Sequence, residues 1–197
     1  MSNLPSSSQS TDSPAPSTAY TEATLTPFQV NVLSVPLVLG LLLVCVLPYV
    51  LVWGPASLVA SIGALGWWVL PVLLVAIVVH ELLHGLGWKL FGGLAWSDIK
   101  FGFQWKVLMP YAHAKVPMTA RAYRWGGALP GLVTGVLPAL LGLALSQPVL
   151  LLFGAILVIA AVGDLMVLWA IRRVPAGASV LDHPSLPGCL VLQENAA

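Results

Sequence analysis

Four apolar stretches constrain what this chain can fold into more than any other feature. They cover about residues 31–53, 67–88, 127–146 and 149–171. A helix needs roughly 20 apolar residues to cross the hydrocarbon core of a bilayer. The chain is 58% hydrophobic and only 8% charged, whereas soluble domains carry roughly 25% charged residues. The sequence therefore predicts an all-α membrane protein with four transmembrane helices.

The positions of the basic residues predict how these helices cross the membrane. All eight follow the second or the fourth apolar stretch: Lys89, Lys100, Lys106, Lys115, Arg121, Arg124, Arg172 and Arg173. The loops on the other side of the four spans contain none. Cytoplasmic segments of membrane proteins are enriched in Lys and Arg. We therefore expect an integral protein of a prokaryotic plasma membrane with both termini in the cytoplasm. The net charge is +1, which by itself says nothing about nucleic acid; we expect no nucleic-acid partner.

The remaining segments are expected to flank one membrane domain, residues 29–174. Residues 1–28 are rich in Ser, Thr and Pro, which is typical of a disordered tail, and residues 175–197 form a cytoplasmic C-tail. The long loop between the second and third spans alternates aromatic and basic residues around 97–118, which indicates a small β-hairpin. The segment 56–66 is a loop, a re-entrant segment or an extension of the second span.

The second span contains the sequence "HELLH", an H-E-x-x-H motif formed by His80, Glu81 and His84. An unpaired charge in hydrocarbon costs several kcal/mol, so these groups need a reason to be there. Residues i and i+4 share a face of a helix, so both imidazoles can reach one metal ion while Glu81 lies beside it. A hydrolytic zinc site needs three protein ligands and an open position for water.

Asp164 is the natural third ligand, because it is the single Asp, Glu, His, Lys or Arg in the other three spans. Counted back from Lys89 and Arg172 at about 1.5 Å per residue, His84, His80 and Asp164 lie roughly 7, 13 and 12 Å from the cytoplasmic ends of their helices. The three side chains are therefore expected at matching depths. The rival ligands His113, Asp98, Asp182 and His183 all lie in cytoplasmic segments, where polar residues are ordinary.

Several motifs resemble those of the zincin peptidase membrane family, multi-span proteins distantly similar to site-2 proteases. They are "HELLHGLGW", "DIKFGFQWK", "PYAHAKVPM", "ALPGLVTG", "GDLM" and "DHPSLPGC", within roughly residues 75–192. The resemblance implies intramembrane zinc hydrolysis near the cytoplasmic face, with His80, His84 and Asp164 as Zn²⁺ ligands and Glu81 as catalytic base. Site-2 proteases usually carry their aspartate in an Asn/Pro-rich motif followed by Gly, whereas here Gly163 precedes Asp164.

We therefore expect a zinc metalloendopeptidase that hydrolyses peptide bonds of membrane proteins in or next to the bilayer. His113, Arg121 and Arg124 are candidates for substrate or oxyanion contacts. The alternative is a metal-binding membrane protein without catalysis, either a pseudo-protease or a transporter-like protein. A transporter spreads polar residues along a path through the membrane. The clustering of polar groups at one depth favours an enzyme.

Overall fold

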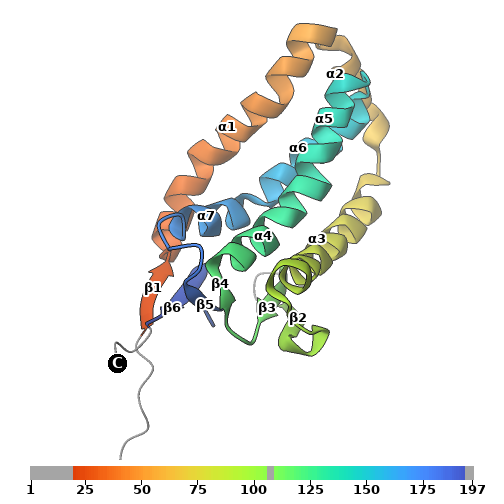
Figure 1. Cartoon of the computed structure of the whole chain (residues 1–197). Helices are drawn as coiled ribbons and strands as arrows, with labels where there is room; N and C mark the ends of the chain where they lie inside the picture. The colour runs from red at the N-terminus through yellow and green to blue at the C-terminus, as the bar shows by residue number, and fades with distance from the viewer. Residues whose placement is uncertain (1–19, 106–108, 194–197) are drawn as a thin grey trace, which may run out of the picture.

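The computed structural model of the chain, which describes residues 20–105 and 109–193, is mostly helical (Figure 1). Three helical segments are long and apolar enough to cross a membrane, or four if a bent pair counts as one span. They are α1 (Pro27–Trp53), α3 (Val69–Gly92), the continuous segment of α4 (Ala120–Pro130), the π-helical turn η2 (Gly131–Val136) and α5 (Leu137–Ala144), and the bent pair α6 (Pro148–Ala160) and α7 (Val162–Ala170).

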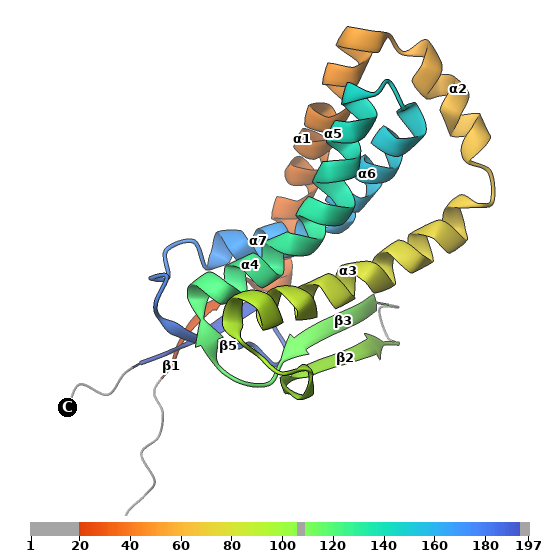
Figure 2. The same ribbon diagram turned by 45° about the vertical axis from the view of Figure 1, so that its right-hand side comes forward.

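The first turn lies where the sequence "WGP" predicts a break. Helix α1 ends at Trp53, and Gly54 follows with φ of +79°, a conformation that favours glycine. The next segment is a separate ten-residue helix, α2 (Ala56–Leu65), which is too short to cross a bilayer. Figure 2 shows α2 joining α1 to α3 at the end of the molecule away from the strands.

The third membrane segment begins seven residues before the stretch that its hydropathy indicates. Its first helix, α4, starts at Ala120 because Thr119 caps it, accepting a hydrogen bond from the backbone N–H of Ala122. This first part carries Arg121 and Arg124, so it does not stand out by hydropathy. Gly135 then lets the segment approach α6 closely, since a Cβ there would lie 2.8 Å from the side chain of Val158.

The fourth predicted span is not one straight helix. Helices α6 and α7 meet at 44°, because Ala161 leaves the helical conformation, with φ of −80° and ψ of 9°. Ala161 is buried and would contact a Cβ at Gly131 at 3.3 Å. The bend places Asp164 in the first turn of α7, where its direction is set by α7 and not by α6.

Two antiparallel sheets accompany the helices, so the all-α prediction is wrong in that respect. The expected hairpin is present as β2 (Ile99–Gln104) and β3 (Met109–Ala114). A four-stranded sheet was not predicted; its strands, in the order of the sheet, are β1 (Tyr20–Thr24), β6 (Gly188–Leu192), β5 (Ser179–Asp182) and β4 (Met118–Thr119).

The N-terminal tail is also more ordered than its composition indicates. Residues 1–19 lie outside the described residues, but Tyr20–Thr24 form strand β1 and Thr26 caps α1. Strand β1 forms because β6 supplies its hydrogen-bonding partner, with Tyr20 opposite Leu192. The expected disorder of residues 1–28 is therefore wrong for residues 20–28.

The strands gather at one end of the helices (Figures 1 and 2). This end collects the segment before α1, the loop between α3 and α4 and the segment after α7, which the basic residues predict to share one face. The largest buried cluster lies here. Its members are Trp88, Leu94, Ile99, Ala114, Met118, Ala120, Ala122, Tyr123, Ile171, Val180 and Cys189.

Candidate metal centre

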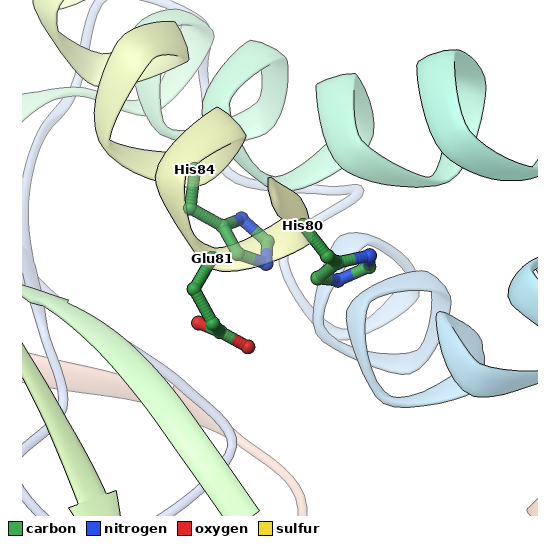
Figure 3. Close-up of side chains that lie close together, drawn as sticks. All are labelled: His80, Glu81 and His84. Carbon is green, nitrogen blue, oxygen red and sulfur yellow. The ribbon is translucent and has the colours of Figure 1, made fainter. Parts of the chain in front are cut away.

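The C-terminal half of α3 presents the three side chains of the H-E-x-x-H motif. His80 and His84 are one helical turn apart, and their rings meet edge to face with centroids 5.0 Å apart. Potential ligand atoms of His80, Glu81 and His84 all lie within 4.8 Å of one another (Figure 3). His84 is buried and the other two side chains are partly buried.

Asp164 of α7 faces this pair of imidazoles. Its Oδ2 lies 2.9 Å from Nε2 of His80, and its Oδ1 lies 3.3 Å from Nε2 of His84. Each oxygen of the Asp164 carboxylate thus contacts one imidazole. The structure therefore brings together His80, His84 and Asp164, residues up to 84 positions apart in the chain.

His84 is held from its other side by α4. Its Nδ1 lies 3.0 Å from the backbone carbonyl oxygen of Gly126, which accepts a hydrogen bond when Nδ1 carries the proton. A neutral imidazole has only one N–H, so Nε2 then presents a lone pair toward Asp164. Such a carbonyl commonly fixes the tautomer and the ring orientation of a histidine that ligates a metal.

Gly126 makes this contact possible because α3 and α4 approach closely at this level. A Cβ on Gly126 would overlap the indole ring of Trp88, and a Cβ on Gly87 would lie 2.7 Å from Cα of Gly126. Trp88 in turn stacks on His84, with centroids 5.8 Å apart and the planes at 25°. No pattern in the sequence marks Gly126 as a neighbour of His84.

The donor set fits zinc. Two imidazole nitrogens and one carboxylate are donors that catalytic zinc sites use, and three ligand atoms at roughly 2.1 Å from a tetrahedral ion lie roughly 3.4 Å apart. The separations of 2.9 and 3.3 Å are close to that value. His84 also has an acceptor at each ring nitrogen, which a neutral imidazole cannot satisfy by donation alone; a cation shared by Nε2 and the carboxylate resolves this.

Glu81 projects from α3 beside the two imidazoles, and Figure 3 shows its carboxylate just below the rings of His80 and His84. Its carboxylate is within hydrogen-bonding reach of the backbone of Ala112 in β3. Across the hairpin, the N–H of Lys115 donates to the carbonyl of Asp98 at 2.8 Å. Backbone groups alternate in direction along a strand, so those of Ala112 and Ala114 face the outer edge of β3. Glu81 therefore lies beside an open strand edge.

The other candidate residues have partners of their own. His113 of β3 lies 2.8 Å from Asp182 through its Nδ1, and the hydrogen bond with Asp182 raises the pKa of His113 above its usual value. Arg124 donates hydrogen bonds to the carbonyls of Ile171 and Val174, where α7 has ended and leaves its last carbonyls without helical partners.

Arg121 is exposed, and its backbone N–H donates to the carbonyl of Ala176 at 2.9 Å. For Arg124, the observed contacts describe a side chain that terminates a helix and joins α4 to the end of α7. Neither observation brings a guanidinium into the cluster of His80, His84 and Asp164.

Residues 73–179 match the family model described as "Putative zincin peptidase". The chain belongs to this family. The match covers more than half of the chain and includes the H-E-x-x-H motif, the β2–β3 hairpin and Asp164. No curated protein and no solved structure matches the chain. Membership of a zincin family agrees with the motif on α3 and supports a metallopeptidase with a metal site, zinc being the metal that the family implies.

Proposed function

We propose that this protein is a zinc metalloendopeptidase that hydrolyses peptide bonds of membrane proteins, in or next to the membrane at its cytoplasmic face. In this proposal His80, His84 and Asp164 hold the zinc ion and Glu81 is the catalytic base. One observation supports this proposal most directly: the single carboxylate of Asp164 in α7 contacts Nε2 of both His80 and His84. Helices this apolar have little other reason to converge on two imidazoles and two acids.

In this proposal Glu81 moves a proton and does not bind the ion. When bound, zinc supplies Lewis acidity, which polarises a scissile carbonyl and makes water a nucleophile at neutral pH. Glu81 takes the proton from that water and passes it to the leaving amine, which is general base and then general acid catalysis. Its carboxylate lies within 4.8 Å of a ring nitrogen of each motif histidine, which is close enough for it to act on a water held at the imidazole cluster.

The open edge of β3 supports an extended substrate. A peptide bond inside a helix is shielded, so a scissile segment must be extended. Strand edges bind such segments through backbone hydrogen bonds. The outward groups of Ala112 lie next to Glu81, and Pro110 beyond it has no N–H, so its carbonyl alone is available to a paired strand. We infer that substrate residues flanking the scissile bond pair with β3 at this edge.

The membrane setting of the proposal rests on the helices and on the position of the site. The metal-binding residues lie on two of the segments that are long and apolar enough to span a bilayer. Basic residues flank these helices at the strand end: Lys89 lies near the end of α3, Arg121 and Arg124 lie in the first half of α4, and Arg172 and Arg173 follow α7. This is the cytoplasmic end by the positive-inside rule. In mechanism this resembles site-2 proteases. A protein that binds metal without catalysis remains the alternative, and the experiment below separates the two.

The test compares the purified wild-type protein with Glu81→Gln in proteoliposomes. Zinc content and cleavage are measured with a membrane-tethered peptide and with the same peptide in soluble form. Removing a general base lowers rates typically 10²- to 10⁴-fold, so Glu81→Gln is expected to keep its zinc and to lose cleavage. Glu22→Gln, the same exchange at an exposed position of β1, is the matched control and is expected to match wild type.

Three results would contradict parts of the proposal. Equal cleavage by wild type and Glu81→Gln rejects Glu81 as base. A zinc-loaded wild type that cleaves neither peptide supports the non-catalytic alternative. Preference for the soluble form of the peptide would reject membrane proteins as the substrate class while leaving the peptidase assignment intact.

A further inference from the structure

Outside the metal centre, the carboxylate of Asp182, the last residue of β5, contacts three groups from two other elements. Its side chain is only 14% exposed. Its Oδ1 accepts a hydrogen bond from the Tyr123 hydroxyl of α4 at 2.7 Å. Its Oδ2 lies 2.8 Å from Nδ1 of His113 and 3.3 Å from the backbone N–H of Ala114, both in β3. One carboxylate thus ties α4 to β3.

These two elements are the ones that contact the motif on α3. On α4, Gly126 lies one turn after Tyr123 and accepts the hydrogen bond from His84. Between them, the Trp88 ring stacks on His84 on one side and on Tyr123 on the other, the latter with centroids 6.1 Å apart and planes at 17°. The path from Asp182 to His84 is therefore a continuous run of packed side chains.

On β3, Ala112 lies two residues before Ala114, along the same outer edge of the strand. The N–H of Ala114 is held by Asp182, while the backbone of Ala112 lies beside Glu81. A displacement of β3 relative to α4 would therefore move the partner of Glu81 and the partner of His84 in different directions. The side chain of Asp182 is the hydrogen-bonding group that engages both elements at this point.

We propose that Asp182 is a positioning residue, whose carboxylate clamps α4 to β3 and so sets the orientation of His84 and the surroundings of Glu81. It touches neither the metal ligands nor a substrate, and it acts through Tyr123 and Gly126 on one side and through Ala114 and Ala112 on the other. The C-terminal sheet, through this residue, is then part of what organises the centre. The predicted effect on kcat rests on the proposed peptidase function, whereas the predicted effect on zinc affinity rests only on the zinc site of that proposal.

Zinc affinity is the first readout, because it reports the contacts that link Asp182 to His84 through Tyr123 and Gly126. It also needs no cleavage assay. Losing an outer partner of a metal ligand costs typically 10- to 100-fold in affinity or activity. For Asp182→Ala we expect a zinc Kd about tenfold higher, at the low end of that range because the contact is indirect. Tyr123→Phe removes the α4 contact alone and is expected to change the Kd in the same direction. Asp182→Asn keeps an oxygen acceptor and is expected to fall between wild type and Asp182→Ala.

The kinetic readout follows at saturating zinc with the membrane-tethered peptide. We expect kcat of Asp182→Ala to fall about tenfold even at saturating peptide, because the variant displaces the surroundings of Glu81. KM is expected to rise as well, because β3 also forms the proposed substrate-binding edge. Asp98→Ala is the matched control. Asp98 also lies next to the hairpin, and its side chain accepts a hydrogen bond from the N–H of Ala95 at 3.0 Å. Among the described residues its side chain makes no hydrogen bond to α4, so its zinc Kd and kcat are expected to match wild type.

The outcomes are distinguishable. A zinc Kd within twofold of wild type for Asp182→Asn and Tyr123→Phe overturns the proposal, and these two variants decide the question if Asp182→Ala does not fold. If Asp182→Ala raises the zinc Kd but leaves kcat unchanged, Asp182 does not act on Glu81 through β3. If wild type cleaves no peptide, the proposed function fails, and the zinc Kd still decides whether Asp182 positions His84.

Discussion

Gly126→Ala is the substitution whose effect the structure specifies most closely. The added Cβ would overlap the Trp88 indole, which is 4% exposed and stacked between His84 and Tyr123. Alanine improves helix propensity by about 1 kcal/mol, but overpacking a tight core typically costs 1–3 kcal/mol. Because the overlap is with a large, buried ring that stacks with both His84 and Tyr123, the upper half of that range applies. The expected net loss of stability is about 1–2 kcal/mol.

For a chain of this length, 1 kcal/mol corresponds to a change in Tm of roughly 2–4 °C. We therefore expect the Tm of Gly126→Ala to fall by roughly 2–8 °C in a thermal unfolding assay of the zinc-loaded protein in detergent. The displaced indole also pushes on His84, so the zinc Kd, measured by competition with a chelator, is expected to rise on the order of tenfold or more.

Gly127→Ala is the matched control, one residue further along the same helix. A Cβ at Gly127 would lie 3.4 Å from the Leu168 side chain, an ordinary van der Waals contact. The gain in helix propensity is then unopposed, and Gly127→Ala is expected to match or exceed the wild-type Tm with an unchanged zinc Kd. If the two variants have the same Tm and zinc Kd, the close approach of α3 and α4 is not what holds His84, and the reasoning fails.

Two further predictions concern the metal and the pH. Chelation is expected to lower the Tm of wild type, because a ligand that binds only the folded state stabilises it, and to leave the Tm of Asp164→Ala nearly unchanged, since that variant lacks a proposed zinc ligand; equal zinc occupancy in both proteins would exclude Asp164 as a ligand. The hydrogen bond with Asp182 raises the pKa of His113, against smaller opposing effects of burial and of Lys100. The contribution of this pair to stability is therefore fully present below the unfolded pKa of about 6.5 and is lost as the pH rises through the raised folded value. The difference in unfolding free energy between wild type and His113→Gln is therefore expected to be largest in acid and to shrink as the pH rises, and denaturant titrations in which it widens with pH would contradict this.

The predictions that succeeded depend on contiguous residues. Hydropathy located the membrane-length helices and the break at "WGP", and the alternation around 97–118 located the β2–β3 hairpin. The i and i+4 spacing of His80 and His84 placed both on one face of α3. The depth argument for Asp164 needed only helical rise and the positions of Lys89 and Arg172, and the structure brings Asp164 to 2.9 Å from His80.

The errors share a different cause. Strand β1 exists only because β6 lies beside it, and the two segments pair Tyr20 with Leu192 from opposite ends of the chain. Composition alone indicates disorder for a Ser- and Pro-rich tail, since it contains no information about a distant partner. Likewise, nothing near Ala161 in the sequence indicates a bend. The bend between α6 and α7 lies where Ala161 packs against Gly131 of the third segment.

The roles of the polar residues outside the membrane helices divide in the same way. Arg124 and His113 have the chemistry of oxyanion donors, and the sequence offers no way to tell that one caps the end of α7 and the other pairs with Asp182. Conversely, Asp182 stands in a polar tail where a carboxylate is unremarkable. Its contacts with Tyr123 and Ala114 join residues 59 and 68 positions away.

The amino-acid sequence alone determined the apolar helices of membrane-spanning length, the H-E-x-x-H motif and the position of Asp164 opposite it, because hydropathy and helical periodicity act over neighbouring residues. The tertiary structure decided which carbonyl faces His84, which strand edge faces Glu81 and which carboxylate joins α4 to β3. These contacts depend on the close approach of elements far apart in the chain, and that approach is set by packing at positions such as Gly126, where a single additional methyl group would not fit.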